Sequence, residues 1–471
     1  MNTLQDILLP IVQAINSYLS DYILIILLVG IGIYFTLRTR FVQLRCFREG
    51  IKKTFSRASK NEKNGSLSSF QALTTAIAAQ VGTGNIVGAC GAILIGGPGA
   101  IFWMWIIAFF GMATVYSEAV LAQKTKIKNE DGSVSGGPVY YIRQAFKGKF
   151  GKFLAGFFAV AIILALGFMG TMVQANSISE ACSNAFHIPR PVIGLLIAAL
   201  AGSIFIGGAH RIGSVTEKIV PIMAVLYFVG GLVVILIRIK HLPETLALIF
   251  KYAFNSTALL GGGIGYTLKT VISQGVKRGL FSNEAGMGST PHAHALTEVE
   301  DPHDQGVVAM IGVFIDTFVV LTITALVVIS TLFTEGGILH NQVLSAENLS
   351  ALGVSKTNAA QLSFGSAFGS SAIGNIFIAV CLLFFAFSTI ISWNLFGRIN
   401  VNYLFGKRSN LIYSILSILF IFIGSIVSND LAWELADMFN NIIVIPNVLA
   451  LFVLSKLVVN ACHKKKLKRQ K

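Results

Sequence analysis

Apolar stretches follow one another along this chain, separated by short polar segments. A transmembrane helix needs about 20 mainly apolar residues. On that criterion the pattern predicts about eleven spanning helices, at 21–37, 68–95, 100–123, 152–183, 191–205, 219–237, 258–276, 305–334, 366–396, 411–427 and 431–454. The expected fold class is therefore an all-α polytopic membrane protein.

The stretch at 68–95 contains residues that a continuous spanning helix would not carry. Gln80-Val81-Gly82-Thr83-Gly84-Asn85-Ile86-Val87-Gly88 places glycines and polar side chains in its middle. In hydrocarbon, every backbone N–H and C=O must be satisfied, so a helix is interrupted only where the freed groups face protein, water or a solute. Secondary transporters hold their cargo at such breaks. The sequence therefore predicts an interrupted helix at 80–88.

A second glycine cluster, Gly261-Gly262-Gly263-Ile264-Gly265, lies five predicted spans later. If the first span is set aside, ten helices remain, and two halves of five lie in opposite senses across the membrane. We expect an N-terminal surface segment, an extra helix and a basic loop at 1–67, five-helix repeats at 68–256 and 257–460, and a basic tail at 461–471. The alternative is that the glycines only permit close helix contact.

Composition and charge agree with a membrane protein. The chain is 54% hydrophobic and 12% charged, whereas soluble domains carry about 25% charged residues. The net charge of +15 comes from cations that gather in the segments 38–63, 124–152, 398–408 and 464–469 and at Lys277 and Arg278. Because cytoplasmic loops collect such cations, we predict a bacterial inner-membrane protein with its N-terminus outside and its C-terminus inside. Anionic lipid explains the charge, so no nucleic-acid partner is expected.

A long motif then links the chain to a family. Gly275-Val276-Lys277-Arg278-Gly279-Leu280-Phe281-Ser282-Asn283-Glu284-Ala285-Gly286-Met287-Gly288-Ser289, together with the 80–88 segment, resembles the alanine or glycine:cation symporters of bacteria and archaea. The resemblance implies a leucine-transporter-type fold of five-plus-five inverted repeats with one extra N-terminal helix. It also implies uptake of a small neutral amino acid coupled to sodium or, less often, a proton. Where the family often has Phe, this chain has Ile264 after Gly263, which leaves the side-chain specificity open.

A zwitterionic substrate needs donors for its carboxylate and acceptors for its ammonium group. The positive end of an interrupted helix supplies donors, here the N–H groups of Gly82, Thr83, Gly84 and Asn85, and carbonyls at 261–265 supply acceptors. The predicted substrate-binding residues are Gln80, Gly82, Thr83, Gly84, Asn85, Phe168, Gly263, Ile264 and Trp393.

Sodium prefers about five or six oxygen ligands, which hydroxyls and carbonyls can provide. Ser388 and Ser392 are one helical turn apart in one predicted span, as are Thr389 and Trp393 on the adjoining face. Ser388, Thr389 and Ser392 carry the hydroxyls. They are the predicted sodium ligands, although such hydroxyls also bond the backbone of their own helix.

Four further polar residues, Asp316, Glu118, His292 and His294, are candidates for a functional or a structural role. Asp316 lies inside a span and is either a coupling group or half of a structural pair with a lysine or arginine. Glu118 is expected at the membrane interface, near Lys124. His292 and His294 form an HxH pair that we assign to gating or to a solvated turn rather than to a metal.

The remaining features exclude other classes. Cys46, Cys90, Cys182, Cys381 and Cys462 form no CxxC, so neither a disulfide nor a metal site is expected. No phosphate-binding loop or nucleophile–base motif is present, so we predict neither an ATP-driven pump nor an enzyme, and no cofactor beyond the coupling ion. The predicted function is sodium symport of alanine or glycine, with D-alanine as a further candidate, by a monomer. Proton coupling, a larger substrate such as glutamine, or a ligand-binding channel or receptor are the competing interpretations.

Overall fold

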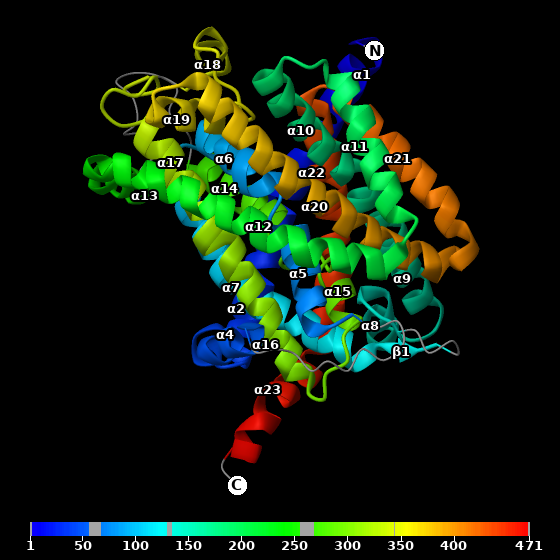
Figure 1. Ribbon diagram of the computed structural model, residues 1–471. Coiled ribbons are helices and arrows are strands. Elements are labelled where there is room, and N and C mark those ends of the chain that lie inside the picture. Colours follow the sequence, from blue (N-terminus) through cyan, green and yellow to red (C-terminus); the bar gives the residue numbers. More distant parts are fainter. Residues whose placement is uncertain (1, 56–66, 130–133, 255–267, 343, 470–471) are drawn as a thin grey trace.

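The computed structural model describes residues 2–55, 67–129, 134–254, 268–342 and 344–469, and these residues are almost entirely helical (Figure 1). The first half of the chain contains α1 (Asn2–Tyr18), η1 (Leu19–Leu24), α2 (Ile25–Arg38), α3 (Val42–Arg45), α4 (Phe47–Phe55), α5 (Ser69–Gln80), η2 (Gly84–Gly88), α6 (Ala89–Gly96), α7 (Ala100–Thr125), β1 (Ile127–Lys128), β2 (Val134–Ser135), α8 (Pro138–Ala145), α9 (Gly148–Ile162), η3 (Ile163–Gly170), α10 (Thr171–Phe186), α11 (Arg190–Phe205), α12 (Gly208–Ile237), η4 (Ile239–His241) and α13 (Leu242–Phe254). The second half contains α14 (Leu268–Asn283), α15 (Pro291–Ala295), α16 (Pro302–Val313), η6 (Phe314–Leu321), α17 (Thr322–Leu332), α18 (Ala346–Ala351), α19 (Ala359–Phe368), α20 (Ser371–Phe405), η7 (Lys407–Ser409), α21 (Asn410–Ile426), α22 (Asn429–Val453) and α23 (Ser455–Arg469).

Within the described part of the chain, eight helices are long and apolar enough to cross a bilayer, and a bent pair of helices makes a ninth span. Two more predicted spans correspond to α11, which is a shorter apolar helix, and to α14, which starts where the described chain resumes after 254. The described part of each predicted stretch is therefore mainly helical, and the all-α polytopic prediction is confirmed. The only strands among the described residues are β1 and β2, a short antiparallel pair.

Several spans contain a π-helical segment in their interior. η2 follows the bend between α5 and α6, η3 joins α9 to α10, and η6 joins α16 to α17. A π turn holds one residue more than an α turn and is often found at functional sites. η1 likewise lies between α1 and α2, so four of the spans are wound unevenly in their interior.

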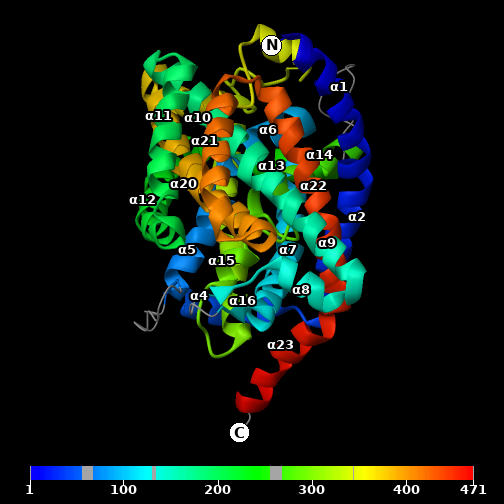
Figure 2. The same ribbon diagram turned by 90° about the vertical axis from the view of Figure 1, so that its right-hand side faces the viewer.

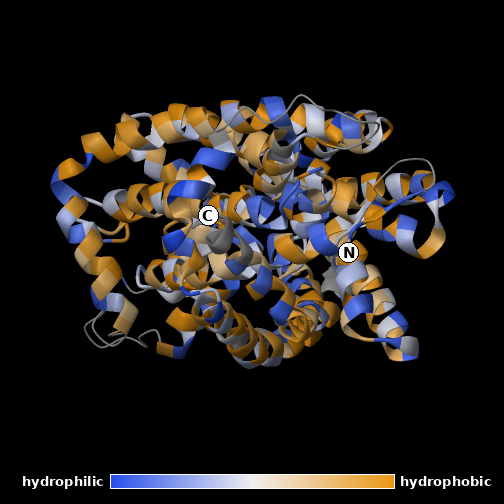
Figure 3. Ribbon diagram, turned by 90° about the horizontal axis from the view of Figure 1, so that it is seen from below, coloured by the Kyte–Doolittle hydropathy of each residue, from blue (hydrophilic) through white to orange (hydrophobic). Residues whose placement is uncertain are grey.

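The helices surround the broken pair α5/α6. α14, α16 and α20 pack against this pair, and α1 runs along α22 at the edge of the molecule (Figure 2). The outer helices are largely hydrophobic on the ribbon, while hydrophilic positions gather among the central helices (Figure 3). The exposed leucines and isoleucines of α21, such as Leu411, Ile412 and Ile415, fit a surface that contacts lipid.

The two termini lie at opposite ends of the molecule, with α4, α8, α15 and β1 at the C-terminal end (Figures 1 and 2). This arrangement is compatible with the predicted orientation. One part of the charge argument was wrong, because Lys277 and Arg278 do not lie in a cytoplasmic loop. Both are buried inside α14, where Asp437 of α22 lies 2.9 Å from the Lys277 ammonium and 3.0 Å from the Arg278 guanidinium. A buried carboxylate that the sequence pattern did not reveal compensates them.

Candidate functional site

The first helix break is where the glycine cluster predicts it. α5 begins at a capping box between Ser68 and Gln71 and ends at Gln80, and the chain turns by 42° before it continues through η2 and α6. The Gly82 N–H donates to Asn85 Oδ1 at 3.0 Å, and the Thr83 N–H donates to Gln174 Oε1 at 3.0 Å. Because these two N–H groups leave the helical pattern, the carbonyls one turn earlier lose their regular donors. The interruption at 80–88 is confirmed.

Two helices press closely on this break. Thr389 Oγ1 of α20 donates to the Ala78 carbonyl, one of the freed carbonyls, at 2.8 Å. A Cβ placed on Gly82 would lie 2.3 Å from Thr389 Oγ1, and a Cβ placed on Gly84 would lie 2.9 Å from Ser282 Cα of α14. The glycines are therefore required for the contact between the break, α20 and α14.

A second break faces the first, and the sequence reasoning missed it. α14 ends at Asn283, and the chain then turns through Glu284, Gly286 and Gly288, all with positive φ, before α15 begins at Pro291. The predicted second break at 261–265, with Gly263 and Ile264, lies outside the described residues. The signal that could have found the observed break is the pair of glycines followed by proline within the 275–291 motif.

Asp316 joins the two breaks. One of its carboxylate oxygens accepts from Asn85 Nδ2 at 2.6 Å, and both oxygens lie 3.0–3.1 Å from Ser282 Oγ. The Thr317 hydroxyl donates to it at 2.7 Å. The carboxylate is fully buried, and these partners are amide and hydroxyl groups rather than a lysine or arginine. The environment thus differs from the structural ion pair that the sequence left open.

Two glutamates hold the second break. Glu118 of α7 accepts from the Gly288 N–H at 3.0 Å and from Asn447 Nδ2 at 2.6 Å. Its side chain is fully buried, and the backbone donors of the turn satisfy it there. Its position near the membrane interface stays a prediction. Glu284 accepts from Trp393 Nε1 at 2.5 Å and from the Ser289 hydroxyl.

Of the predicted aromatic residues, the structure brings Trp393 to the breaks and groups Phe168 elsewhere. The Trp393 ring lies 6.0 Å from that of Phe281, edge to face, and Phe281 also approaches the Gly84 position. Phe168 stacks on Phe420 of α21 at 4.6 Å. Its ring contacts therefore belong to a smaller cluster formed by η3, α20 and α21.

The predicted polar residues differ in their hydrogen-bond partners. Gln80 Nε2 donates to the Asn283 carbonyl at 2.9 Å, which is another link between the two breaks. Ser388 Oγ donates to the carbonyl of Phe385 within its own helix and lies 3.5 Å from the Met223 sulfur. Ser392 Oγ is buried, and no partner for it is found among the described residues.

His292 and His294 are buried rather than solvated. His292 Nε2 is 2.8 Å from Asn400 Nδ2, and His294 Nδ1 is 2.7 Å from Gln305 Nε2. Burial lowers the pKa of His292 to about 4 and that of His294 to about 3, so both rings are neutral at pH 7. They act as packed polar groups beneath the second break.

Gln174, Ser282, Asn283 and Glu284 are functional candidates that sequence reasoning did not single out. All four are buried at the breaks. Gln174 also accepts from the Thr83 hydroxyl at 2.6 Å. For Gln174, a polar side chain inside the predicted span 152–183 was the available signal, because such residues are costly in lipid and tend to be functional. Ser282, Asn283 and Glu284 lie outside the predicted spans, within the 275–289 motif.

Comparison with known proteins places this geometry in context. The model of the "Sodium:alanine symporter family" matches residues 5–471. The chain is 38% identical over 452 residues to "Sodium/alanine symporter AgcS" of Methanococcus maripaludis, which covers 96% of this chain and 95% of that protein. It is 41% identical over 459 residues to "Probable sodium/glutamine symporter GlnT" of Bacillus subtilis, with 97% and 91% covered. The crystal structure of MhsT in complex with L-phenylalanine has a TM-score of 0.55 at 15% identity, covers 85% of this chain and 96% of that one, and shows a shared leucine-transporter-type fold.

Proposed function

Because this chain belongs to the sodium:alanine symporter family, we propose that it imports a small neutral amino acid, alanine or glycine and including D-alanine, together with sodium. It is proposed to act as a monomer in a bacterial inner membrane, with its N-terminus outside. The observation that carries the proposal is the contact of Thr389 with the Ala78 carbonyl at the first break. This contact puts a hydroxyl and a freed carbonyl side by side, next to N–H groups that have left the helix.

The substrate carboxylate is proposed to bind the N–H groups at Gly82–Asn85. Those of Gly82 and Thr83 donate to side-chain amide oxygens, and an amino acid carboxylate is a stronger acceptor for the same donors. We expect it to replace the Asn85 and Gln174 oxygens, so that both side chains respond to binding. Gln80 adds an amide next to the second break.

Side-chain size is proposed to be limited by the closeness of the helices. Phe281 approaches the Gly84 position, and Trp393 packs edge to face against Phe281. Bulky rings and a close backbone leave room for a methyl group rather than for a long side chain. The proposed contribution of Phe168, Gly263 and Ile264 to specificity remains a prediction.

Sodium is proposed to bind between α5 and α20. The Ala78 carbonyl, the Thr389 hydroxyl and the Ser392 hydroxyl are oxygens of the type that a hard cation prefers. Ser392 is buried with its oxygen unsatisfied among the described residues, which favours it as a ligand. Ser388 would have to turn away from Met223 to take part.

Asp316 is proposed to couple ion binding to the closing of the two breaks. It is the carboxylate that holds Asn85 of the first break and Ser282 of α14 together. A change in its charge or position alters both contacts at once. Coupling requires one structural element with two states, and the binding of sodium and the binding of substrate must both favour the same state. Asp316 is proposed to be part of such an element.

The driving force is sufficient for such an importer. Moving one cation inward across about 100 mV supplies about 2.3 kcal/mol. That corresponds to roughly 50-fold accumulation of a neutral solute, before any sodium gradient is counted.

Uptake of labelled alanine into proteoliposomes tests the proposal. We expect accumulation above the external concentration when a sodium gradient is imposed, and loss of that accumulation when potassium replaces sodium at the same membrane voltage. Equal accumulation in both salts would exclude sodium coupling, and a response to an imposed pH gradient would then favour a proton.

Competition and accumulation distinguish this symport from glutamine transport, from a channel and from a receptor. Glutamine, which the name of one relative suggests, would displace alanine at low concentration if the pocket accepted a longer side chain. A channel would equilibrate alanine without accumulating it. A receptor would bind alanine and show no flux at all.

A further inference from the structure

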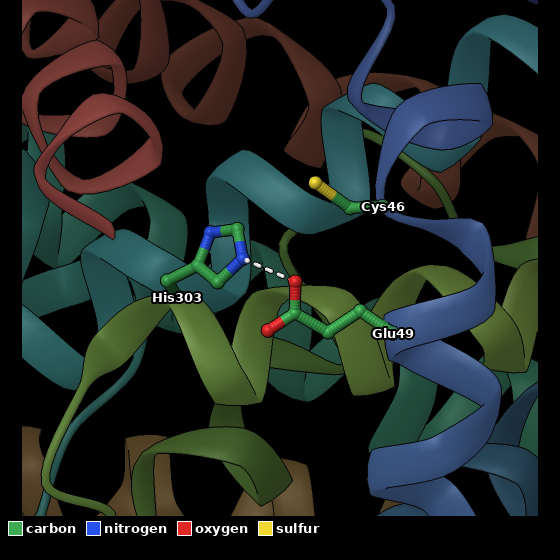
Figure 4. Close-up of side chains that lie close together, drawn as sticks. All are labelled: Cys46, Glu49 and His303. Atoms are coloured by element: carbon green, nitrogen blue, oxygen red, sulfur yellow. Dashed lines mark ion pairs between the residues drawn. The ribbon is translucent and has the colours of Figure 1, made fainter. Parts of the chain in front are cut away.

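Three metal-binding side chains from distant parts of the chain converge at the end of the molecule that carries the C-terminus. Cys46 ends α3, Glu49 lies in the first turn of α4, and His303 is the second residue of α16. The Cys46 sulfur, a Glu49 carboxylate oxygen and a His303 ring nitrogen all lie within 4.8 Å of one another. Figure 4 shows the Glu49 and His303 side chains pointing toward each other, with Cys46 above them.

We propose that Cys46, Glu49 and His303 bind a divalent transition metal ion of the Zn²⁺ class. Thiolate, carboxylate and imidazole are its usual protein ligands, at about 2.3, 2.0–2.2 and 2.0–2.1 Å. Two such ligands on a tetrahedral ion are about 3.4 Å apart, and His303 Nε2 lies 3.6 Å from Glu49 Oε2. A shift of up to about 1.3 Å in the sulfur or carboxylate completes a three-ligand site with a fourth position for water.

The histidine is already oriented for this role. The Tyr116 hydroxyl of α7 lies 2.7 Å from His303 Nδ1. When Nδ1 donates to that oxygen, Nε2 carries the lone pair and faces Glu49. Metal-binding histidines nearly always have such a partner on the second nitrogen, and it fixes the tautomer. The backbone N–H of His303 is also held by Asp301 Oδ1 at 3.0 Å.

The scaffold around the cluster is closely packed. Lys53 and Asp304 form an ion pair of 2.8 Å between α4 and α16. A Cβ on Gly50 would lie 2.8 Å from the Val307 carbonyl, so the two helices touch at the backbone. The ligands are therefore brought together without an ion, which reduces the cost of binding one.

The alternative is that Glu49 and His303 form only an ion pair. At 3.6 Å the two atoms are farther apart than in a direct hydrogen bond. Both Cys46 and His303 are buried, whereas the Glu49 side chain is 12% exposed. Glu49 thus offers the ion a route from solvent.

A metal at this position would join α4 to the helix that continues through η6, which contains Asp316. The proposal itself concerns binding and does not depend on the transported substrate. It differs from the expectation, based on the cysteine spacing, that the chain has no metal site.

Cobalt binding to the full-length, tag-free protein in detergent tests the site. After treatment with a chelator, Co²⁺ should bind with one equivalent per chain and produce the thiolate-to-cobalt absorption band, and Zn²⁺ should remove that band. Cys46→Ser should abolish the band, while the matched control Cys182→Ser should retain it. Tyr116→Phe should weaken binding about 10- to 100-fold, because it removes the partner of the second nitrogen.

Thermal unfolding gives an independent measurement. Zn²⁺ should raise the unfolding temperature of the wild type and of Cys182→Ser, and should leave that of Cys46→Ser unchanged; each variant is first checked for a single folded species by gel filtration. Absence of the cobalt band in the wild type would overturn the proposal. So would a band and a zinc-induced stabilisation of equal size in Cys46→Ser.

Discussion

Gly82→Ala is the sharpest test of how the first break is built. The added Cβ would lie 2.3 Å from Thr389 Oγ1, about 1.1 Å closer than the 3.4 Å at which ordinary contact begins. Gln174 Oε1 would be 3.2 Å away. Overpacking of this kind costs about 1–3 kcal/mol. We therefore expect a lower unfolding temperature and weaker sodium-dependent uptake.

The chain offers a matched control and a partial rescue. Gly88 lies in the same break region, but a Cβ there would meet its nearest atom at 3.6 Å, so Gly88→Ala should be neutral or slightly stabilising. Adding Thr389→Ala to Gly82→Ala removes the oxygen that the new methyl group meets. The two changes should then be non-additive by about 0.5–3 kcal/mol, while sodium affinity stays low because the hydroxyl is gone.

Fluorescence-detected gel filtration after heating measures the stability of the four variants, and alanine uptake against sodium concentration measures their affinity. Two results would refute the reasoning. One is a Gly82→Ala protein as stable as Gly88→Ala. The other is strict additivity of the Gly82 and Thr389 substitutions, which would mean that the two side chains do not share this space.

Four further predictions follow from the contacts at the breaks and on α22. Thr389→Ala alone should raise the sodium concentration for half-maximal uptake about tenfold, because it removes one hydrogen-bonding group. Saturating sodium should restore most of the uptake rate. An unchanged dependence on sodium would show that Thr389 only contributes to packing. Asn85→Ala and Gln80→Ala should weaken alanine binding to the purified protein and leave the yield of folded protein unchanged. Normal alanine affinity in both variants would show that the substrate does not bind at this break. Asp316→Asn should abolish gradient-driven accumulation in proteoliposomes more strongly than alanine exchange across them, because it removes the charge that its neighbours bind; accumulation at the wild-type level would make the carboxylate structural. Asp437→Asn should destabilise the protein by about 3–5 kcal/mol, since it removes the nearest carboxylate of both buried cations and leaves Lys277 with Glu434 at 3.9 Å, and this is read from the yield of folded protein.

The sequence predicted the spans and the first break because both depend on local composition. A run of apolar residues or a glycine cluster inside it is visible without knowledge of the fold. The break after Asn283 was missed, because it is recognised by its contact with the first break. In that contact Ser282 lies against Gly84, and the two residues are far apart in the chain.

The positions of the charged residues show the same limit. Lys277 and Arg278 were assigned to a cytoplasmic loop because cations are usual in such loops. That argument takes no account of a partner far away in the sequence, such as Asp437. Likewise, adjacency suggested Thr389 as an ion ligand, whereas no spacing could have paired Gln174 with the Thr83 N–H. The order of apolar and polar residues in one sequence does not reveal contacts between segments that are far apart in the chain.

The π-helical segments have a consequence for motion within a span. η2, η3 and η6 each store a surplus residue near the middle of a helix that contributes to the breaks or packs beside them. If such a segment rewinds as regular α-helix, the part beyond it turns by about 100° and advances by about 1.5 Å, the increment of one residue. The side chains on one half of a span can in this way change direction, while the helical hydrogen bonds at both ends of the span are kept.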